Sequence, residues 1–132
     1  RMLYLYPEYV RAAVIAAPGR ITYLSEELPW PDGIKDMESL LGCGSINYKD
    51  LQNIPIQILV GEADTEFIDY RTAEHSGPLI EKFGRSRLER VIHLQEIYAA
   101  HGLDSDLMVL PNCGHVEGPM IAQAKTFFLQ IK

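Results

Sequence analysis

Residues 54–64 read IPIQILVGEAD and contain the clearest strand signal in the chain. The run is apolar and rich in β-branched residues up to Gly61, which ends it. Such a run is typical of a β-strand, because branched side chains fit the pleated surface of a sheet. We therefore predict a strand over 54–61, with Asp64 in the turn that follows its carboxyl end.

Two further stretches predict strands. The first is the apolar run over 9–17, which Pro18 and Gly19 end, and its apolar character suits a strand buried on both faces of a sheet. The second covers 107–110 and stops at Pro111, which has no N–H to donate to a sheet.

Helical signals follow these strands. Ser86 and Glu89 form the Ser-x-x-Glu pattern of a capping box, apolar residues then recur at helical spacing, and Gly102 is suited to the helix end. We predict a helix over 87–101. A last helix is expected to begin near Pro119, because proline fits the first helical turn. Its buried stripe is expected to consist of Ala122, Phe127, Phe128 and Ile131.

Two long connections separate the predicted elements. Residues 20–53 form an irregular stretch with a short helix expected over 34–41, and 62–85 form another with a short helix near 79–82. The alternation of strands and helices predicts an α/β fold with parallel strands and helices on the faces of the sheet. Sheets of this kind bind ligands at the carboxyl ends of their strands.

The composition excludes several classes of protein. The chain has 132 residues, 47% hydrophobic and 23% charged, as expected for one globular domain or part of one. Its net charge of −6 argues against a nucleic-acid partner, and no apolar run reaches the ~20 residues of a membrane-spanning helix. Cys43 and Cys113 are too few for a disulfide scaffold and lack the spacing of a zinc site. A solvated helix face is expected to carry Arg85, Arg87 and Arg90.

The start of the chain favours a truncated or processed protein. Residue 1 is not Met, and Pro7 and Glu8 interrupt the opening residues too early for a signal peptide. The sequence also lacks the Asn-x-Ser/Thr pattern of glycosylation. A cytoplasmic location is therefore favoured.

Two strand ends carry side chains suited to acid–base chemistry. Asp64 follows the predicted strand over 54–61, and His115 follows the predicted strand over 107–110. A predicted helix lies between them in the sequence. A hydrolytic triad needs this pair, because the imidazole takes and returns the nucleophile's proton while the carboxylate orients the ring. Taken singly, an aspartate after a strand is most often a turn or cap residue, and a loop histidine is usually just exposed. Gly61 and Gly114 are expected to let the backbone turn sharply at these strand ends.

The order of these residues resembles the α/β-hydrolase family, whose triad follows the chain order nucleophile, acid, histidine. Residues 56–64 resemble the seventh strand and acid turn of that family, and 107–118 resemble its eighth strand and histidine loop. Residues 1–7 resemble the end of the helix after the nucleophile, and 11–19 resemble the sixth strand. The whole chain, 1–132, is thus similar to the C-terminal part of an α/β-hydrolase three-layer sandwich. The stretch 20–53 would be a cap or insertion.

This resemblance implies a function. The segments YPEYV (6–10) and APG (17–19) resemble esterases and polyester depolymerases within the family. By the resemblance, Asp64 orients His115, and His115 activates a serine that attacks a carboxylic ester. No metal or organic cofactor is implied. The expected partners are a small-molecule ester and either a missing N-terminal half or a second copy of the chain, with neither nucleic acid nor a membrane.

The chain departs from the family at the nucleophile. The Gly-x-Ser-x-Gly elbow does not occur in it, and the nearest segment, GCGS over 42–45, has the wrong order. By the family pattern the elbow would lie just before Arg1, and the family also hosts Asp and Cys nucleophiles. A non-catalytic interaction or binding module is the alternative for the chain as it stands.

Other candidate residues carry weaker signals. Glu62 and Asp69 are fallback acids. Cys113 lies too near His115 in sequence to indicate a nucleophile–base pair, and we expect a buried thiol. Trp30 would either line an acyl pocket or anchor packing. The remaining histidines are expected to be structural or exposed: His75, His93 and His101.

Overall fold

The computed structural model describes residues 1–66 and 73–131. Its strands are β1 (Ala13–Ala16), β2 (Ile56–Gly61) and β3 (Ser105–Leu110). Its helices are α1 (Met2–Leu5), α2 (Met37–Leu41), α3 (Tyr48–Leu51), α4 (Ala73–Phe83), α5 (Arg87–Ala100) and α6 (Glu117–Gln130), and η1 (Pro7–Tyr9) is a 3-10 turn. None of the helices in these ranges is long and apolar enough to span a bilayer.

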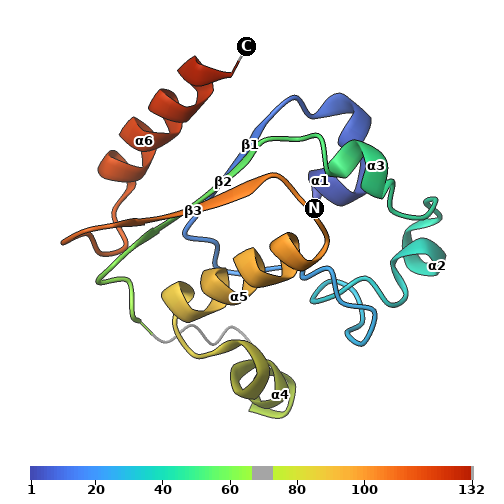
Figure 1. Ribbon diagram of the computed structural model, residues 1–132. Coiled ribbons are helices and arrows are strands. Elements are labelled where there is room, and N and C mark those ends of the chain that lie inside the picture. Colours follow the sequence, from blue (N-terminus) through green and yellow to red (C-terminus); the bar gives the residue numbers. More distant parts are fainter. Residues whose placement is uncertain (67–72, 132) are drawn as a thin grey trace.

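The strands form one parallel sheet in the order β1-β2-β3. Ile56 of β2 pairs with Ala13 of β1 on one side and with Ser105 of β3 on the other, so the three carboxyl ends lie at the same edge. Helix α5 packs on one face of the sheet and α6 on the opposite face (Figure 1). The predicted α/β fold, a parallel sheet with flanking helices, is confirmed.

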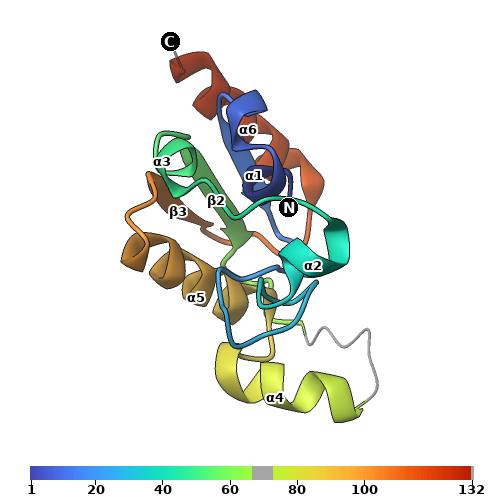
Figure 2. The same ribbon diagram turned by 90° about the vertical axis from the view of Figure 1, so that its right-hand side faces the viewer.

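Strand β2 is the centre of the core, and each of its residues is buried. Ile58 and Val60 belong to a large apolar cluster that includes Leu94 of α5. On the other face, Leu59 belongs to a much smaller cluster with Met120 of α6. Helix α4 lies beyond α5, away from the sheet, in both views (Figure 2). The face of the sheet under α5 is therefore covered by many buried side chains, whereas the face under α6 is covered by few.

The sparse cover on the α6 face shows that two predictions were wrong, one about the buried stripe of the last helix and one about the strand over 9–17. The stripe expected on α6 is not buried: Ala122 and Phe128 are exposed, and Phe127 is only partly covered. Met120 is the residue that α6 buries, because α6 meets the sheet mainly through its first turns. The first strand is also shorter than predicted, since Pro7 begins a 3-10 turn, and β1 is a half-covered edge strand rather than one buried on both faces.

The connections contain more regular structure than their sequences indicate. Helix α4 is much longer than the short helix expected near 79–82, and α3 was not anticipated. The stretch 20–53 contributes buried residues to the large cluster, among them Leu24 and Met37. Trp30 packs against the same cluster, and the guanidinium carbon of Arg1 lies 5.5 Å from the centroid of its ring. Trp30 is therefore a packing anchor in this structure.

The capping box at the start of α5 is confirmed. The Ser86 hydroxyl accepts a hydrogen bond from the Glu89 N–H at 3.2 Å, and the Glu89 carboxylate accepts one from the Ser86 N–H at 2.9 Å. The Ser86 and Arg85 amides that donate to this carboxylate lower the pKa of Glu89. At the other end, Gly102 adopts φ +70° just after the C-cap, as a helix-ending glycine does. The first turn of α5 is therefore held in one place.

A pair of buried tyrosines ties α5 to the N-terminal segment. The Tyr4 hydroxyl lies 2.7 Å from the Thr22 carbonyl and 2.8 Å from the Tyr98 hydroxyl. Because Tyr4 has one hydroxyl proton and a carbonyl can only accept, Tyr4 donates to Thr22 and Tyr98 donates to Tyr4. Burial raises the pKa of Tyr98 to about 12. Both hydroxyls thus act as neutral hydrogen-bonding groups.

This donor order predicts unequal effects for two conservative substitutions. Tyr4→Phe leaves the buried Tyr98 hydroxyl and the Thr22 carbonyl unpaired, and should lower the free energy of unfolding by about 1–3 kcal/mol. Tyr98→Phe leaves the Tyr4–Thr22 bond intact and should cost about 1 kcal/mol or less. Urea unfolding followed by circular dichroism measures both, and a larger loss for Tyr98→Phe than for Tyr4→Phe would contradict the donor order.

Candidate active site

The carboxyl ends of β2 and β3 are joined by main-chain hydrogen bonds. The Glu62 N–H donates to the Leu110 carbonyl at 2.9 Å, and the Ala63 N–H donates to the Cys113 carbonyl at 2.8 Å. Asn112 turns the chain between these contacts with φ 53°, a left-handed conformation that asparagine tolerates. The turn after β2 and the loop after β3 therefore form one rigid unit.

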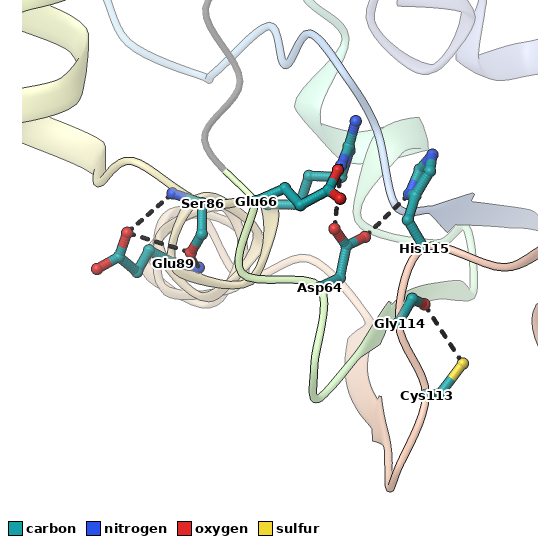
Figure 3. Close-up of polar contacts among 8 residues, drawn as sticks. Asp64, Glu66, Ser86, Glu89, Cys113, Gly114 and His115 are labelled. Carbon is teal, nitrogen blue, oxygen red and sulfur yellow. Dashed lines mark hydrogen bonds and ion pairs between the residues drawn. The ribbon is translucent and has the colours of Figure 1, made fainter.

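Asp64 and His115 meet on this unit. Nδ1 of His115 lies 2.9 Å from Oδ2 of Asp64, and the two side chains point toward each other (Figure 3). The carboxylate can only accept, so Nδ1 carries the proton and donates it. The Asp64 side chain is fully buried, whereas that of His115 is 49% exposed. The structure brings the two predicted residues together in the geometry of an acid–histidine pair.

The other edge of the His115 ring is available for chemistry. Since Nδ1 is protonated, Nε2 is the nitrogen that can accept a proton, and it has no partner within residues 1–66 and 73–131. His115 lines a pocket of about 400 Å³ between the end of β1 and the start of α6. Its walls include Ala17, Met120, Ile121 and Ala124, and they carry no hydroxyl or thiol. The imidazole therefore lines a mostly apolar pocket whose described wall residues offer no hydroxyl or thiol.

Arg87 is a component of the site that the sequence analysis assigned to a solvated surface. That prediction is wrong for Arg87 and Arg90, which are 7% and 8% exposed, whereas Arg85 is exposed as predicted. Nη1 of Arg87 lies 3.0 Å from Oδ1 of Asp64. The signal was the position of Arg87 directly after the helix cap. A helix that follows a parallel strand begins at the carboxyl edge of the sheet, where Asp64 also lies.

The fallback candidates lie outside the pair. Glu62 is exposed and accepts a hydrogen bond from the Asn112 N–H at 3.0 Å, and Asp69 falls outside the described residues. Cys113 is buried, as predicted, and its sulfur points away from the imidazole toward the Gly114 carbonyl (Figure 3). The structure therefore gives neither Glu62 nor Cys113 a place beside His115.

The other histidines form local contacts. Nδ1 of His93 lies 3.0 Å from Oε2 of Glu96, one turn further along α5. His101 contacts the Ile97 carbonyl and stacks on Tyr48. The side chain of His75 is outside the described part of the chain. Over that part, His, Cys, Asp and Glu side chains form no group of three that could hold a metal ion.

Gly61 is required for a different reason than the one predicted. Neither Gly61 nor Gly114 has a positive φ, so neither is needed for a left-handed turn. A Cβ on Gly61 would lie 2.2 Å from the Cys113 carbonyl oxygen, whereas a Cβ on Gly114 would meet nothing within 4 Å. Gly61 is thus the point where the end of β2 and the histidine loop come into close contact.

This contact predicts the effect of adding one methyl group. Gly61→Ala should push the loop that carries His115 away from Asp64, lower the free energy of unfolding by about 1–3 kcal/mol, and remove the low-field proton resonance of the His115–Asp64 hydrogen bond. Gly114→Ala is the matched control and should change neither urea stability nor this NMR signal. Retention of the signal at full stability in Gly61→Ala would show that the loop has room to adjust.

Comparison with known proteins identifies the fold. No protein-family model and no curated protein matches the chain. Among solved structures, poly(aspartic acid) hydrolase-1 from Sphingomonas sp. KT-1 is similar with a TM-score of 0.72 and 22% identity, over 98% of this chain and 50% of that one. A poly(3-hydroxybutyrate) depolymerase from Bordetella parapertussis is similar with a TM-score of 0.61 and 25% identity, over 90% of this chain and 40% of that one.

The chain therefore spans half or less of the length of the structures that it matches. The likeness covers nearly all of its described elements, and the neighbours are named a hydrolase and a depolymerase. The chain has an α/β-hydrolase-type fold, and no Gly-x-Ser-x-Gly segment occurs in its 132 residues.

Proposed function

We propose that the chain is the C-terminal part of a serine hydrolase that cleaves carboxylic esters, and that it supplies Asp64 and His115 to the triad. The observation that carries this proposal is the 2.9 Å contact between Nδ1 of His115 and Oδ2 of the fully buried Asp64. It leaves Nε2 as the basic nitrogen of a ring that lines an apolar pocket.

The geometry supports a specific division of work. His115 would remove the proton of the nucleophile through Nε2 and return it to the leaving alcohol. Asp64 would hold the ring in the tautomer that leaves Nε2 unprotonated, and would stabilise the imidazolium after proton transfer. The backbone N–H groups that stabilise the oxyanion belong, in this fold, to the nucleophile elbow and to an earlier loop. We place both outside the 132 residues.

The substrate class is proposed from the walls of the site and from the neighbours. The pocket beside His115 is mostly apolar, which suits an acyl or alkyl group. The structural neighbours are named a poly(aspartic acid) hydrolase and a poly(3-hydroxybutyrate) depolymerase. We propose a carboxylic ester as substrate, and the stretch 20–53 as an insertion that packs on the α5 face of the sheet. The pocket is equally open to an Asp or Cys nucleophile from an upstream segment.

The first test is the sequence that encodes the residues before Arg1. We expect a Gly-x-Ser-x-Gly elbow within about twenty residues upstream, after a predicted strand. An Asp or Cys at the centre of the elbow would keep the hydrolase fold but change the chemistry. If no such elbow precedes Arg1, the proposal of a serine hydrolase fails.

The second test is kinetic. In the protein that includes the upstream segment, His115→Ala and Asp64→Asn should each lower kcat for a p-nitrophenyl ester by about 10³–10⁴-fold, with little change in KM. His93→Ala removes a histidine outside the site and should leave kcat unchanged. Full activity in His115→Ala would exclude His115 as the base.

An alternative function follows from the exposed apolar side chains of α6. Ile121 is 51% exposed, Phe128 48% and Leu129 87%, and exposed apolar patches mark interaction sites. Within the described residues the pocket beside His115 also lacks a nucleophile. The chain as it stands would then be a non-catalytic binding module, with a second copy or another protein on α6.

Two measurements on the isolated chain separate these functions. The 132-residue chain should cleave no p-nitrophenyl ester, because it contains no elbow. In light scattering it should self-associate through α6, and Phe128→Lys with Leu129→Lys should shift it toward the monomer, whereas Lys49→Ala should not. Ester cleavage by the isolated chain that His115→Ala abolishes would show that it holds a nucleophile after all.

A further inference from the structure

The second oxygen of the Asp64 carboxylate has its own partner. Oδ2 accepts the hydrogen bond from His115, and Oδ1 lies 3.0 Å from Nη1 of Arg87. The Asp64 side chain is fully buried and that of Arg87 is 8% exposed. Charges this far from water are weakly screened, so the guanidinium acts strongly on the carboxylate.

The position of Arg87 in its helix is not explained by helix stability. It is the first residue of α5, where the positive end of the helix dipole disfavours a cation. Its Nε is also buried, with no hydrogen-bond partner among the described residues, which costs free energy. The contact with Asp64 offsets both costs, because it pairs two charges that would otherwise be buried alone.

The first turn of α5 contacts Asp64 twice. The guanidinium of Arg87 binds its side chain, and the Leu88 N–H lies 3.4 Å from its main-chain carbonyl. The capping box of Ser86 and Glu89 holds this turn in place. The cation therefore has a fixed position relative to the carboxylate.

The charges of the site indicate what Arg87 does. When His115 is neutral, Arg87 and Asp64 together carry no net charge. Without Arg87, a neutral His115 would leave the negative charge of Asp64 buried and uncompensated. The Asp64–His115 pair would lower this free-energy cost by retaining a proton. A pair that retains its proton cannot accept one from a nucleophile.

We propose that Arg87 is a positioning residue: its buried guanidinium holds Asp64 with Oδ2 toward His115, and its loss favours retention of a proton by the Asp64–His115 pair. The catalytic consequence rests on the proposed function, but the effect on His115 protonation does not. Arg87 touches neither the pocket nor the reacting atoms, and acts through the carboxylate.

Among the described residues, the other charged groups near His115 face solvent. Glu66 lies 3.9 Å from Nη1 of Arg87 and is 80% exposed. Glu117, from α6, lines the pocket with His115 and is exposed, and Glu62, from the turn after β2, bonds to the Asn112 N–H. Water and salt screen these carboxylates, so their effect on the imidazole is small beside that of the buried pair.

The test compares three substitutions in the protein that includes the upstream segment. Arg87→Met removes both charge and hydrogen bond, Arg87→Gln keeps a donor without the charge, and Arg87→Lys keeps the charge. NMR of histidine Cε1 follows the protonation of His115 with pH, and kcat/KM for a p-nitrophenyl ester is measured over the same range. The His115 signal is assigned from its loss in His115→Ala.

We expect His115 to retain its proton to higher pH in Arg87→Met and Arg87→Gln than in the unsubstituted protein. Their kcat/KM should fall about tenfold more at about pH 6 than at about pH 9, because the base is protonated at the lower pH. Arg87→Lys should behave like the unsubstituted protein. Arg90→Met removes an equally buried arginine of α5 and should lower the melting temperature without moving the His115 titration.

Three outcomes would overturn the inference. These are an unchanged His115 titration in Arg87→Gln, rescue by Arg87→Gln as complete as by Arg87→Lys, and an equal shift in Arg90→Met. If Arg87→Met does not fold, the Gln and Lys variants decide. If the titration shifts as expected but the unsubstituted protein cleaves no ester, the role of Arg87 stands and the proposed hydrolase function fails.

Discussion

The site is built around one buried carboxylate. Asp64 is withdrawn from water, and a negative charge in that position is tolerated only when polar or charged partners surround it. Arg87 and His115 each contact one of its oxygens. These partners come from α5 and from the loop after β3, so the carboxylate links elements that are distant in the chain. The direction of the imidazole and the contact between α5 and the turn after β2 both involve this carboxylate.

The backbone supplies the frame that makes the contacts possible. Parallel pairing of β2 with β3 brings their carboxyl ends to one edge, and main-chain bonds from Glu62 and Ala63 join the two ends. Gly61 allows the histidine loop to approach to a distance that a side chain would prevent. On the other side of Asp64, the capping box fixes where α5 begins. The polar site is thus held by main-chain contacts rather than by long, mobile side chains.

The two faces of the sheet differ in a way that fits part of a larger hydrolase fold. Helix α5 and the stretch 20–53 cover one face with a large apolar cluster. On the other face α6 buries Met120 and leaves Phe128 and Leu129 largely exposed. The pocket beside His115 opens on this thin side, between β1 and α6. A further segment seated there would both cover apolar surface and reach the imidazole, which is where the proposed function places the nucleophile.

The sequence by itself determined the features that rest on local chemistry. The apolar run of β2, the capping box of α5 and the order of Asp64 and His115 are visible without coordinates, because branching, capping and chain order are properties of neighbouring residues. The exposure of α6, the edge position of β1 and the length of α4 were not predictable in this way. Each depends on which other segments pack against the helix or strand, and the spacing of apolar residues along the sequence does not reveal those segments.

The tertiary structure alone decided the role of single residues within the site. Arg87 appears in the sequence among other basic residues of a helix, and only the fold shows that it is buried against Asp64. Gly61 appears as a turn residue, yet the reason for it is the carbonyl of Cys113 on a different strand end. Both cases have one physical cause. Segments that are far apart in the chain bury each other's side chains and come into close contact. The free energy of a buried charge or an added methyl group depends on these neighbouring segments.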